Sequence, residues 1–309
     1  MTPSAPGAIA ILQLEGDVET ILSASSRSAG PWPIGHARLG CPGGIDDCLI
    51  VRVDDRCVQI MPHGGPRVQQ RLLEWLEDLG ATHTRHSKRP YPEAADPIEA
   101  SMLKALASAS SPLAIDLLLQ QPRRWSECIH WTEDDERRSR RLRHLLTPPR
   151  IVMIGAPNVG KSSLLNTLAG RDRSIAFDAP GTTRDFVSSE VECAGIVVHW
   201  FDTPGLRTTD DEIEHDAITV ARRLIEHADV LLALADAEAA WPSTDRAPHL
   251  RIGTKVDRSP IPGADIQIST VTGEGLHELV GAIRDTLIPP ADLENDAPWR
   301  FDDDLPHSG

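Results

Sequence analysis

The sequence predicts an α/β protein in which a smaller α+β N-terminal domain precedes a mainly parallel sheet with helices on both faces. From residue 150 onward, apolar runs that suit strands alternate with amphipathic stretches that suit helices. The run RIVMIG (150–155) is continuously apolar, as a strand buried on both faces requires. The 309 residues are enough for two domains.

Residues 1–118 are predicted as the α+β domain. The segments GAIAILQLEG and CLIVRVDDRCVQIMP are rich in Ile, Val and Leu with partial alternation, which suits strands. In GPRVQQRLLEWLEDLG, Leu72, Leu76 and Leu79 recur at helical spacing before Gly80, which fits a C-cap. A second helical stretch, PIEASMLKALASAS, follows.

Residues 119–148 are predicted as a helical linker. In TEDDERRSRRLRHLL, Thr132 is the expected N-cap, acidic residues fill the first turn and arginines gather toward the end. We interpret it as a solvated, salt-bridged helix, with an RNA-binding helix as the alternative; TPPR then ends it. Residues 149–288 form the second predicted domain. The acidic, Pro-rich segment 289–309 predicts disorder, with Trp299 and Phe301 as a candidate docking point.

Composition narrows the class of protein. A net charge of −15 argues against a nucleic-acid or membrane surface over the whole molecule, although a local basic patch leaves direct nucleic-acid binding open. The five cysteines form no C-x-x-C pair, which favours buried free thiols in a reducing compartment. We expect a cytoplasmic protein without a membrane segment, because no apolar run approaches the roughly 20 residues needed to span a bilayer.

The stretch IVMIGAPNVGKSSLLNTLAG (151–170) has the spacing G-x-x-x-x-G-K-[ST], and it follows a predicted strand and opens a predicted helix. Glycines at these positions let backbone N–H groups surround phosphate oxygens, and the helix N-terminus adds favourable potential. We therefore predict a P-loop NTPase domain in which Lys161 reaches the β- and γ-phosphates and Ser162 binds Mg²⁺. The predicted phosphate-binding residues are Gly155, Asn158, Val159, Gly160, Lys161, Ser162 and Ser163.

Three further motifs follow at predicted strand ends. In DTPG (202–205), Asp202 would bind Mg²⁺ through water and the Gly205 N–H would meet the γ-phosphate. In TKVD (254–257), the Asp257 carboxylate can accept from the N1–H and exocyclic amine of guanine, a pairing that adenine cannot offer. The segment STV (269–271) is placed for a backbone contact to the guanine O6. The predicted base-binding residues are Thr254, Lys255, Asp257, Ser269 and Thr270, and the motifs together predict a G domain that binds GTP and GDP.

Two positions bear on hydrolysis. The segment DAPGTTRD (178–185) looks like a switch I loop, with Thr183 closing on Mg²⁺ and the γ-phosphate. Leu206 follows DTPG where Ras-like enzymes carry a water-orienting Gln. An apolar side chain cannot position the attacking water, so hydrolysis must recruit another group or be slow.

At this point residues 150–287 resemble the tRNA-modification GTPases of the MnmE (TrmE) family, through GAPNVGKSSLLNTLAGRDRSIAFDAPGTTRD and FDTPGLRTTDDEIE. The resemblance implies that Asn158 helps to bind an activating K⁺ ion and that Glu214 orients the catalytic water. Its implied catalytic residues are Glu214, Lys161 and Thr183, and its implied metal-binding residues are Ser162, Thr183, Asp202 and Asn158. It also implies a homodimer in which the two G domains order each other's switch loops.

More weakly, residues 5–118 are similar to the family's N-terminal dimerisation and folate-binding domain. The family usually carries Arg where Gln13 stands, so folate binding stays open. The family's near-terminal Cys-x-x-Lys-type motif has no counterpart, and segment 119–147 is the candidate remnant of its helical domain. Three hypotheses follow: a Mg²⁺-dependent, K⁺-stimulated GTPase, a nucleotide-gated interaction protein with negligible hydrolysis, and wobble-uridine modification of tRNA with a partner protein.

Overall fold

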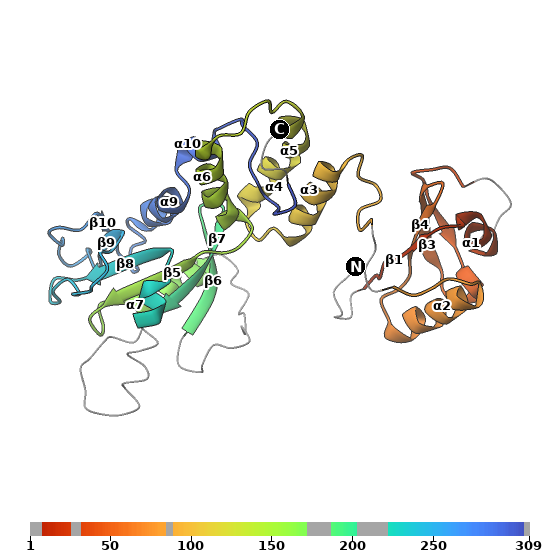
Figure 1. Ribbon diagram of the computed structural model, residues 1–309. Coiled ribbons are helices and arrows are strands. Elements are labelled where there is room, and N and C mark those ends of the chain that lie inside the picture. Colours follow the sequence, from red (N-terminus) through yellow and green to blue (C-terminus); the bar gives the residue numbers. More distant parts are fainter. Residues whose placement is uncertain (1–7, 26–31, 85–88, 172–186, 203–221, 306–309) are drawn as a thin grey trace. The chain divides into compact units, whose positions relative to one another are not determined.

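The structure is a computed structural model that describes residues 8–25, 32–84, 89–171, 187–202 and 222–305 (Figure 1). The chain forms two compact units, Met1–Ala100 and Ser101–Gly309. The division therefore falls at residue 100 instead of the predicted residue 118. The reason is that the helices after residue 100 pack onto segments much later in the chain.

The first unit contains a four-stranded antiparallel sheet with the strand order β1-β4-β3-β2. Its strands are β1 (Leu12–Glu15), β2 (Ala37–Gly40), β3 (Cys48–Asp54) and β4 (Cys57–Met61). Its helical elements are α1 (Val18–Ser25), the short 3₁₀ helix η1 (Pro42–Gly44) and α2 (Pro66–Asp78). The core includes Leu22 of α1, Ile50 and Ile60 of the sheet and Leu76 of α2. The predicted α+β character is thus confirmed in this unit.

The helix α2 ends as the sequence predicts. Gly80 adopts φ +90°, a left-handed conformation that favours glycine. Its N–H donates to the carbonyl of Glu77 (2.9 Å), and the N–H of Ala81 donates to the carbonyl of Leu76 (3.0 Å). The otherwise unpaired carbonyls of the last turn are satisfied in this way.

The second unit begins with helices and continues into a six-stranded sheet. Its helical elements before the sheet are α3 (Pro97–Ser108, which starts in the first unit), α4 (Pro112–Leu119), α5 (Gln121–Ser126), α6 (Glu133–Leu142) and η2 (Arg143–Leu145). The strands are β5 (Arg150–Gly155), β6 (Val187–Cys193), β7 (Ile196–Asp202), β8 (Val230–Ala235), β9 (Leu250–Gly253) and β10 (Ile266–Gln267). The helices that follow or connect them are α7 (Lys161–Arg171), α9 (Leu276–Leu287) and α10 (Pro290–Leu293).

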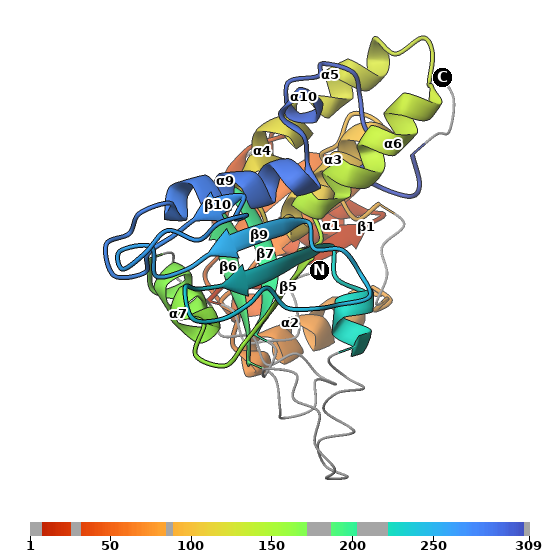
Figure 2. The ribbon, with the colours of Figure 1, turned by 90° about the vertical axis from the view of Figure 1, so that its left-hand side faces the viewer.

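The sheet order is β10-β9-β8-β5-β7-β6, and every neighbouring pair is parallel except β6 with β7. The strand β5 lies between β7 and β8, with Met153 opposite both Asp202 and Leu232. Figure 2 shows α7 and α9 beside this sheet, where α7 contacts β5 and α9 contacts β8. The predicted mainly parallel sheet is confirmed, and the carboxyl ends of β5, β7, β8 and β9 meet at one edge.

The hairpin β6–β7 contacts the start of α4 through its turn. Gly195 adopts φ +90°, and a Cβ there would lie 2.6 Å from Cγ of Leu113. The N–H of Leu113 donates to the Gly195 carbonyl (3.2 Å), and the Ser111 hydroxyl accepts from the N–H of Val197 (3.0 Å). These contacts therefore join the start of α4 to the sheet at the β6–β7 turn.

The predicted N-cap of α6 is confirmed, but its solvated character is wrong. Thr132 and Asp135 form a reciprocal capping box. Arg138 and Ser139, in contrast, are buried against residues 295–300. The predicted salt-bridged character is seen in the i,i+4 ion pair between Glu133 and Arg137 (3.6 Å), whereas Arg138 turns toward the later segment.

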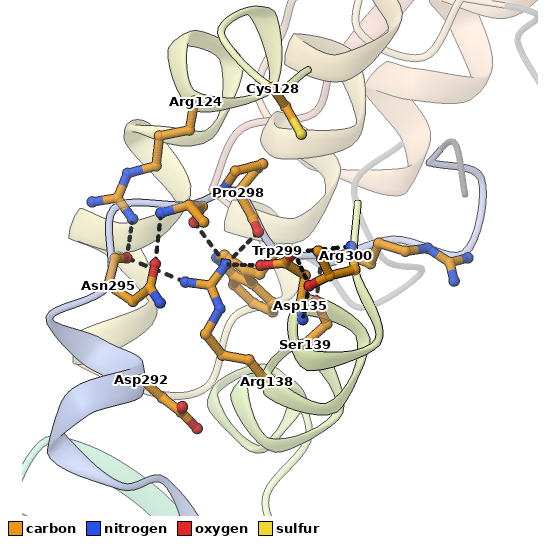
Figure 3. A network of polar contacts seen from close by, with 12 residues as sticks. Arg124, Cys128, Asp135, Arg138, Ser139, Asp292, Asn295, Pro298, Trp299 and Arg300 are labelled. Carbon is orange, nitrogen blue, oxygen red and sulfur yellow. Dashed lines mark hydrogen bonds and ion pairs between the residues drawn. The ribbon is translucent and has the colours of Figure 1, made fainter. Parts of the chain in front are cut away.

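Residues 289–305 are folded against the helices, where composition alone predicted disorder. The Arg138 guanidinium donates to the carbonyls of Asn295 (3.3 Å), Ala297 (2.8 Å) and Pro298, as Figure 3 shows. Trp299 is only 1% exposed, and its carbonyl accepts from the indole N–H of Trp125 (3.3 Å). Buried aromatic rings and a guanidinium that binds three carbonyls offset the entropy cost of ordering the segment.

Ion pairs extend this contact along the acidic segment. Asp292 accepts two hydrogen bonds from Arg141, at 2.5 and 2.9 Å, and Asp302 pairs with Lys104 at 2.8 Å. The acidic residues thus face basic helices of their own unit. We name residues 289–305 the closing segment. It packs on α5 and α6 through these contacts.

Candidate functional site

The glycine-rich loop 155–160 joins β5 to α7 at the carboxyl edge of the sheet. Gly155 passes close to β8, and a Cβ there would lie 2.7 Å from the carbonyl oxygen of Leu234. Asn158 (φ 63°) and Gly160 (φ 108°) both adopt left-handed backbone conformations. This geometry turns the loop tightly before the N-terminus of α7, as a phosphate-binding loop requires.

Lys161 starts α7 and folds back over the loop. Its ammonium donates to the carbonyls of Gly155 (3.0 Å) and Ala156 (3.1 Å), and the side chain is buried. Burial lowers the pKa of Lys161, and the nearby Asp202 carboxylate opposes that shift. Two neutral carbonyls compensate a buried cation only partly, so the loop favours an anionic ligand.

Ser162 and Asp202 come together as the candidate Mg²⁺ site. The Ser162 hydroxyl donates to Oδ2 of Asp202 at the end of β7. The other carboxylate oxygen, Oδ1, is buried and receives no hydrogen bond from the described part of the chain. A hydroxyl and a carboxylate oxygen fit Mg²⁺, which takes its remaining ligands from water and phosphate.

The predicted base-binding loop after β9 is hydrogen-bonded directly to the glycine-rich loop. The Thr254 hydroxyl is buried and donates to the carbonyls of Val159 (2.6 Å) and Ala235 (3.2 Å). The Lys255 ammonium donates to the carbonyl of Asn158 (2.7 Å). Both predicted residues therefore lie beside the P-loop, and hydrogen bonds join the two loops.

Asp257 and Ser269 bring the last two motifs together. The Ser269 hydroxyl donates to Oδ1 of Asp257 (2.5 Å) and accepts weakly from the N–H groups of Val271 (3.3 Å) and Thr272 (3.2 Å). Ser269 is fully buried, whereas Asp257 is exposed. The serine thus holds an exposed carboxylate in place, with Thr270 next to it in the same loop.

One residue of this site was not singled out from the sequence. Asp236 follows β8 directly and is 8% exposed, and its Oδ2 accepts from the Lys255 ammonium at 2.6 Å. The sequence feature that could have indicated Asp236 is its place as an acidic residue immediately after the apolar run VLLALA. A carboxylate at the carboxyl end of a buried strand lies at the edge where the motifs meet.

Other predicted site residues divide into two groups. Val159 is buried beneath the loop, and Ser163 lies in the first turn of α7. Thr183, Gly205 and Glu214, together with Leu206, lie outside the described residues. Among the described residues, no group of three or more His, Cys, Asp or Glu side chains forms a metal cluster, and no helix is long and apolar enough to cross a membrane.

Residues 150–260 match the family model described as 50S ribosome-binding GTPase. The tRNA modification GTPase MnmE of Sinorhizobium medicae is 43% identical over 145 residues, which cover 44% of this chain and 33% of that protein. The predicted resemblance to the MnmE family is confirmed. An MnmE of a Synechococcus strain is 36% identical over 184 residues, covering 56% of this chain and 40% of that protein. The chain thus spans between a third and two fifths of the length of these two MnmE proteins.

Solved structures give more distant matches. We call the MnmE-like region of this chain the G domain from here on. Era in complex with MgGDPNP and a 16S ribosomal RNA segment is 28% identical, with a TM-score of 0.36, over 45% of this chain and 56% of that chain. The cytosolic domain of the T. maritima FeoB iron transporter in a GDP form is 23% identical, with a TM-score of 0.34, over 45% of this chain and 63% of that chain.

Proposed function

We propose that the protein is a Mg²⁺-dependent GTPase that hydrolyses GTP to GDP and phosphate. The observation that carries this proposal is the pair of hydrogen bonds that join the predicted base-binding loop directly to the P-loop. Lys255 donates to Asn158, and Thr254 donates to Val159. This link supports a single ligand that would bind Lys161 through its phosphates and Asp257 through its base, and a carboxylate there would pair with guanine and not with adenine.

Within this proposal, each described residue has a binding or orienting role. The N–H groups of the P-loop and the Lys161 ammonium hold the β- and γ-phosphates. The Ser162 hydroxyl and the Asp202 carboxylate would hold Mg²⁺, which would supply electrostatic stabilisation to the transferred phosphoryl group. Water attacks the γ-phosphorus, the bond to the β–γ bridging oxygen breaks, and GDP leaves with phosphate.

The finer parts of the mechanism rest on the family resemblance. We propose that Glu214 orients the attacking water and that Thr183 closes on Mg²⁺ and the γ-phosphate. We further propose that Asn158 helps to bind a stimulating K⁺ ion. Its left-handed backbone, at φ 63°, is one that asparagine tolerates better than most residues. Association of two G domains in a homodimer would then order the loops around the nucleotide. Folate binding stays an open prediction.

The decisive experiment measures GTP turnover by the full chain in a series of cations. We expect hydrolysis with Mg²⁺ and a faster rate in KCl than in NaCl, with ATP not hydrolysed. Equal rates in the two salts would remove the K⁺ proposal and leave the GTPase proposal standing. Equal binding of guanine and adenine nucleotides would contradict the proposal as a whole.

A nucleotide-gated interaction protein is the second candidate, because Leu206 stands where Ras-like enzymes carry a water-orienting Gln. The Glu214→Ala variant separates the two. The GTPase proposal predicts that this variant loses most turnover while it retains GDP affinity. The same near-zero turnover in wild type and variant would favour the interaction protein.

The relatives are named as tRNA modification GTPases, and we propose partner-dependent tRNA modification as a third role of this chain. The partner would be a protein of the same modification pathway. Analysis of wobble uridines in a deletion strain tests this role, since unchanged uridine modification in the deletion strain would remove it.

A further inference from the structure

Asp236 lies at the point where three strands of the G domain end. It follows Ala235, which is opposite Gly253 in the register of β8 and β9, while Leu234 is opposite Gly155 of β5. The P-loop and the base-binding loop therefore leave the sheet on either side of this carboxylate. Only 8% of the residue is exposed.

Both oxygens of the Asp236 carboxylate accept hydrogen bonds, one from its own loop and one from Lys255. Oδ1 accepts from the N–H groups of Glu238 (3.0 Å) and Ala239 (2.9 Å), and Oδ2 accepts from the Lys255 ammonium (2.6 Å). The two backbone bonds fix the carboxylate in its own loop. Its second oxygen is therefore a stationary acceptor for the lysine.

Lys255 is held at both ends of its side chain. Its backbone adopts φ 56°, an uncommon conformation for a residue other than glycine, and its ammonium bridges Asp236 and the carbonyl of Asn158. The side chain as a whole is 35% exposed. Its aliphatic stem is therefore fixed at both ends and accessible, in the same loop as the exposed Asp257.

We propose that Asp236 is a positioning residue for nucleotide recognition. It holds the ammonium of Lys255 so that the lysine stem forms a flat, ordered support for the face of the purine, while Asp257 binds the edge of the base. This inference rests on the proposed guanine-nucleotide binding and adds a residue that the binding motifs do not include. Asp236 acts through Lys255 and does not itself touch the nucleotide.

The effect is a matter of preorganisation. Without the carboxylate, the long lysine side chain regains rotational freedom and has to be ordered again when the base binds. We expect the affinity for GDP to fall about tenfold, which corresponds to about 1.4 kcal/mol.

The test compares wild type with Asp236→Asn by titration with a fluorescent GDP analogue in Mg²⁺. Asparagine retains an oxygen that can accept the backbone N–H groups, so the variant mainly removes the charge that holds Lys255. The matched control is Asp265→Asn, whose carboxylate accepts from the backbone N–H of Arg251 (2.7 Å) at the start of β9. We expect the control to bind GDP within twofold of wild type.

Two readouts separate positioning from a general structural role. In a Lys255→Met background, Asp236→Asn should cause no further loss of affinity. The ratio of GDP to inosine diphosphate affinity should also stay at its wild-type value, because inosine differs only at the edge that Asp257 binds. A loss of equal size in the Lys255→Met background would overturn the inference, and so would wild-type GDP affinity in Asp236→Asn.

Failure of the proposed function looks different, since wild type itself would then show no GDP binding. If thermal melting shows that Asp236→Asn does not fold, Asp236→Glu is judged by the same titration. Its carboxylate is displaced by one methylene, so weaker binding than wild type is expected and equal affinity overturns the inference.

Discussion

Truncation of Trp299 tests whether the closing segment is part of the folded core. Its indole is 1% exposed and meets Phe301 edge-on, with ring centroids 5.7 Å apart. Removing a buried aromatic side chain of this size costs about 3–5 kcal/mol. In a unit of this size that loss corresponds to a fall in Tm of roughly 6–20 °C. We expect Trp299→Ala to show this fall in Tm when thermal melting is followed by far-UV circular dichroism.

A milder substitution sharpens this prediction. The Trp299 indole N–H is buried and has no hydrogen-bond partner among the described residues, so Trp299→Phe loses packing without losing a hydrogen bond. We expect it to cost about 1–2 kcal/mol. As a surface control, Asp304→Asn, at a side chain 85% exposed, should stay within about 0.5 kcal/mol of wild type. A loss below about 1 kcal/mol in Trp299→Ala would refute the argument that this segment is packed.

Three further predictions concern the hairpin and the nucleotide site. Gly195→Ala should destabilise the second unit by about 2–4 kcal/mol in urea unfolding, through left-handed strain and contact with Leu113. Adding Leu113→Ala to Gly195→Ala should relieve only the part of this destabilisation that comes from the steric contact. Full recovery of stability would contradict the contribution from backbone strain. Asp257→Asn should weaken GDP binding by roughly 10- to 100-fold. It should improve binding of xanthosine diphosphate, because the C2 carbonyl of xanthine can accept a hydrogen bond from the new amide. Unchanged GDP affinity in calorimetry would contradict the proposed role of Asp257. Burial alone would raise the pKa of Asp236, but hydrogen bonds from Lys255 and two backbone N–H groups hold it below the ordinary 3.8. The ionised carboxylate therefore contributes its full stability above pH 3.8, and this contribution is lost as the pH falls through the lower folded-state pKa. We expect the Tm difference between wild type and Asp236→Asn to narrow over that pH range. A constant Tm difference across the range would contradict this role of the carboxylate.

The candidate nucleotide site could be located in the sequence because its motifs are local. The spacing of Gly155, Gly160, Lys161 and Ser162 follows from the geometry of a loop between a strand and a helix. The later motifs then fall at strand ends that a parallel sheet brings to one edge. In the structure, Thr254 of one motif hydrogen-bonds the P-loop, and Ser162 hydrogen-bonds Asp202 of another.

The closing segment was not predictable by the same reasoning. Arg138 and the carbonyls that it binds are separated by about 160 positions, and nothing in the charge pattern of its own helix indicates those partners. Acidic and proline-rich composition predicted disorder for residues 289–309, yet Trp299 and Arg138 supply apolar burial and hydrogen bonds that composition does not register. Asp236 was missed for a related reason, because its partner Lys255 becomes a neighbour only when β8 and β9 pair.

The partnership between Arg138 and residues 295–298 also sets an order of events during synthesis. At roughly 5–20 residues per second, the ribosome takes on the order of ten seconds to add the residues that separate them. During that interval the guanidinium lacks these carbonyl partners and has Asp135 of its own helix as a nearby opposite charge, while the strands in between are synthesised and can pair. We therefore expect the nascent chain to complete its nucleotide-binding sheet first, and to lock the preceding helices only when Pro298 and Trp299 have emerged.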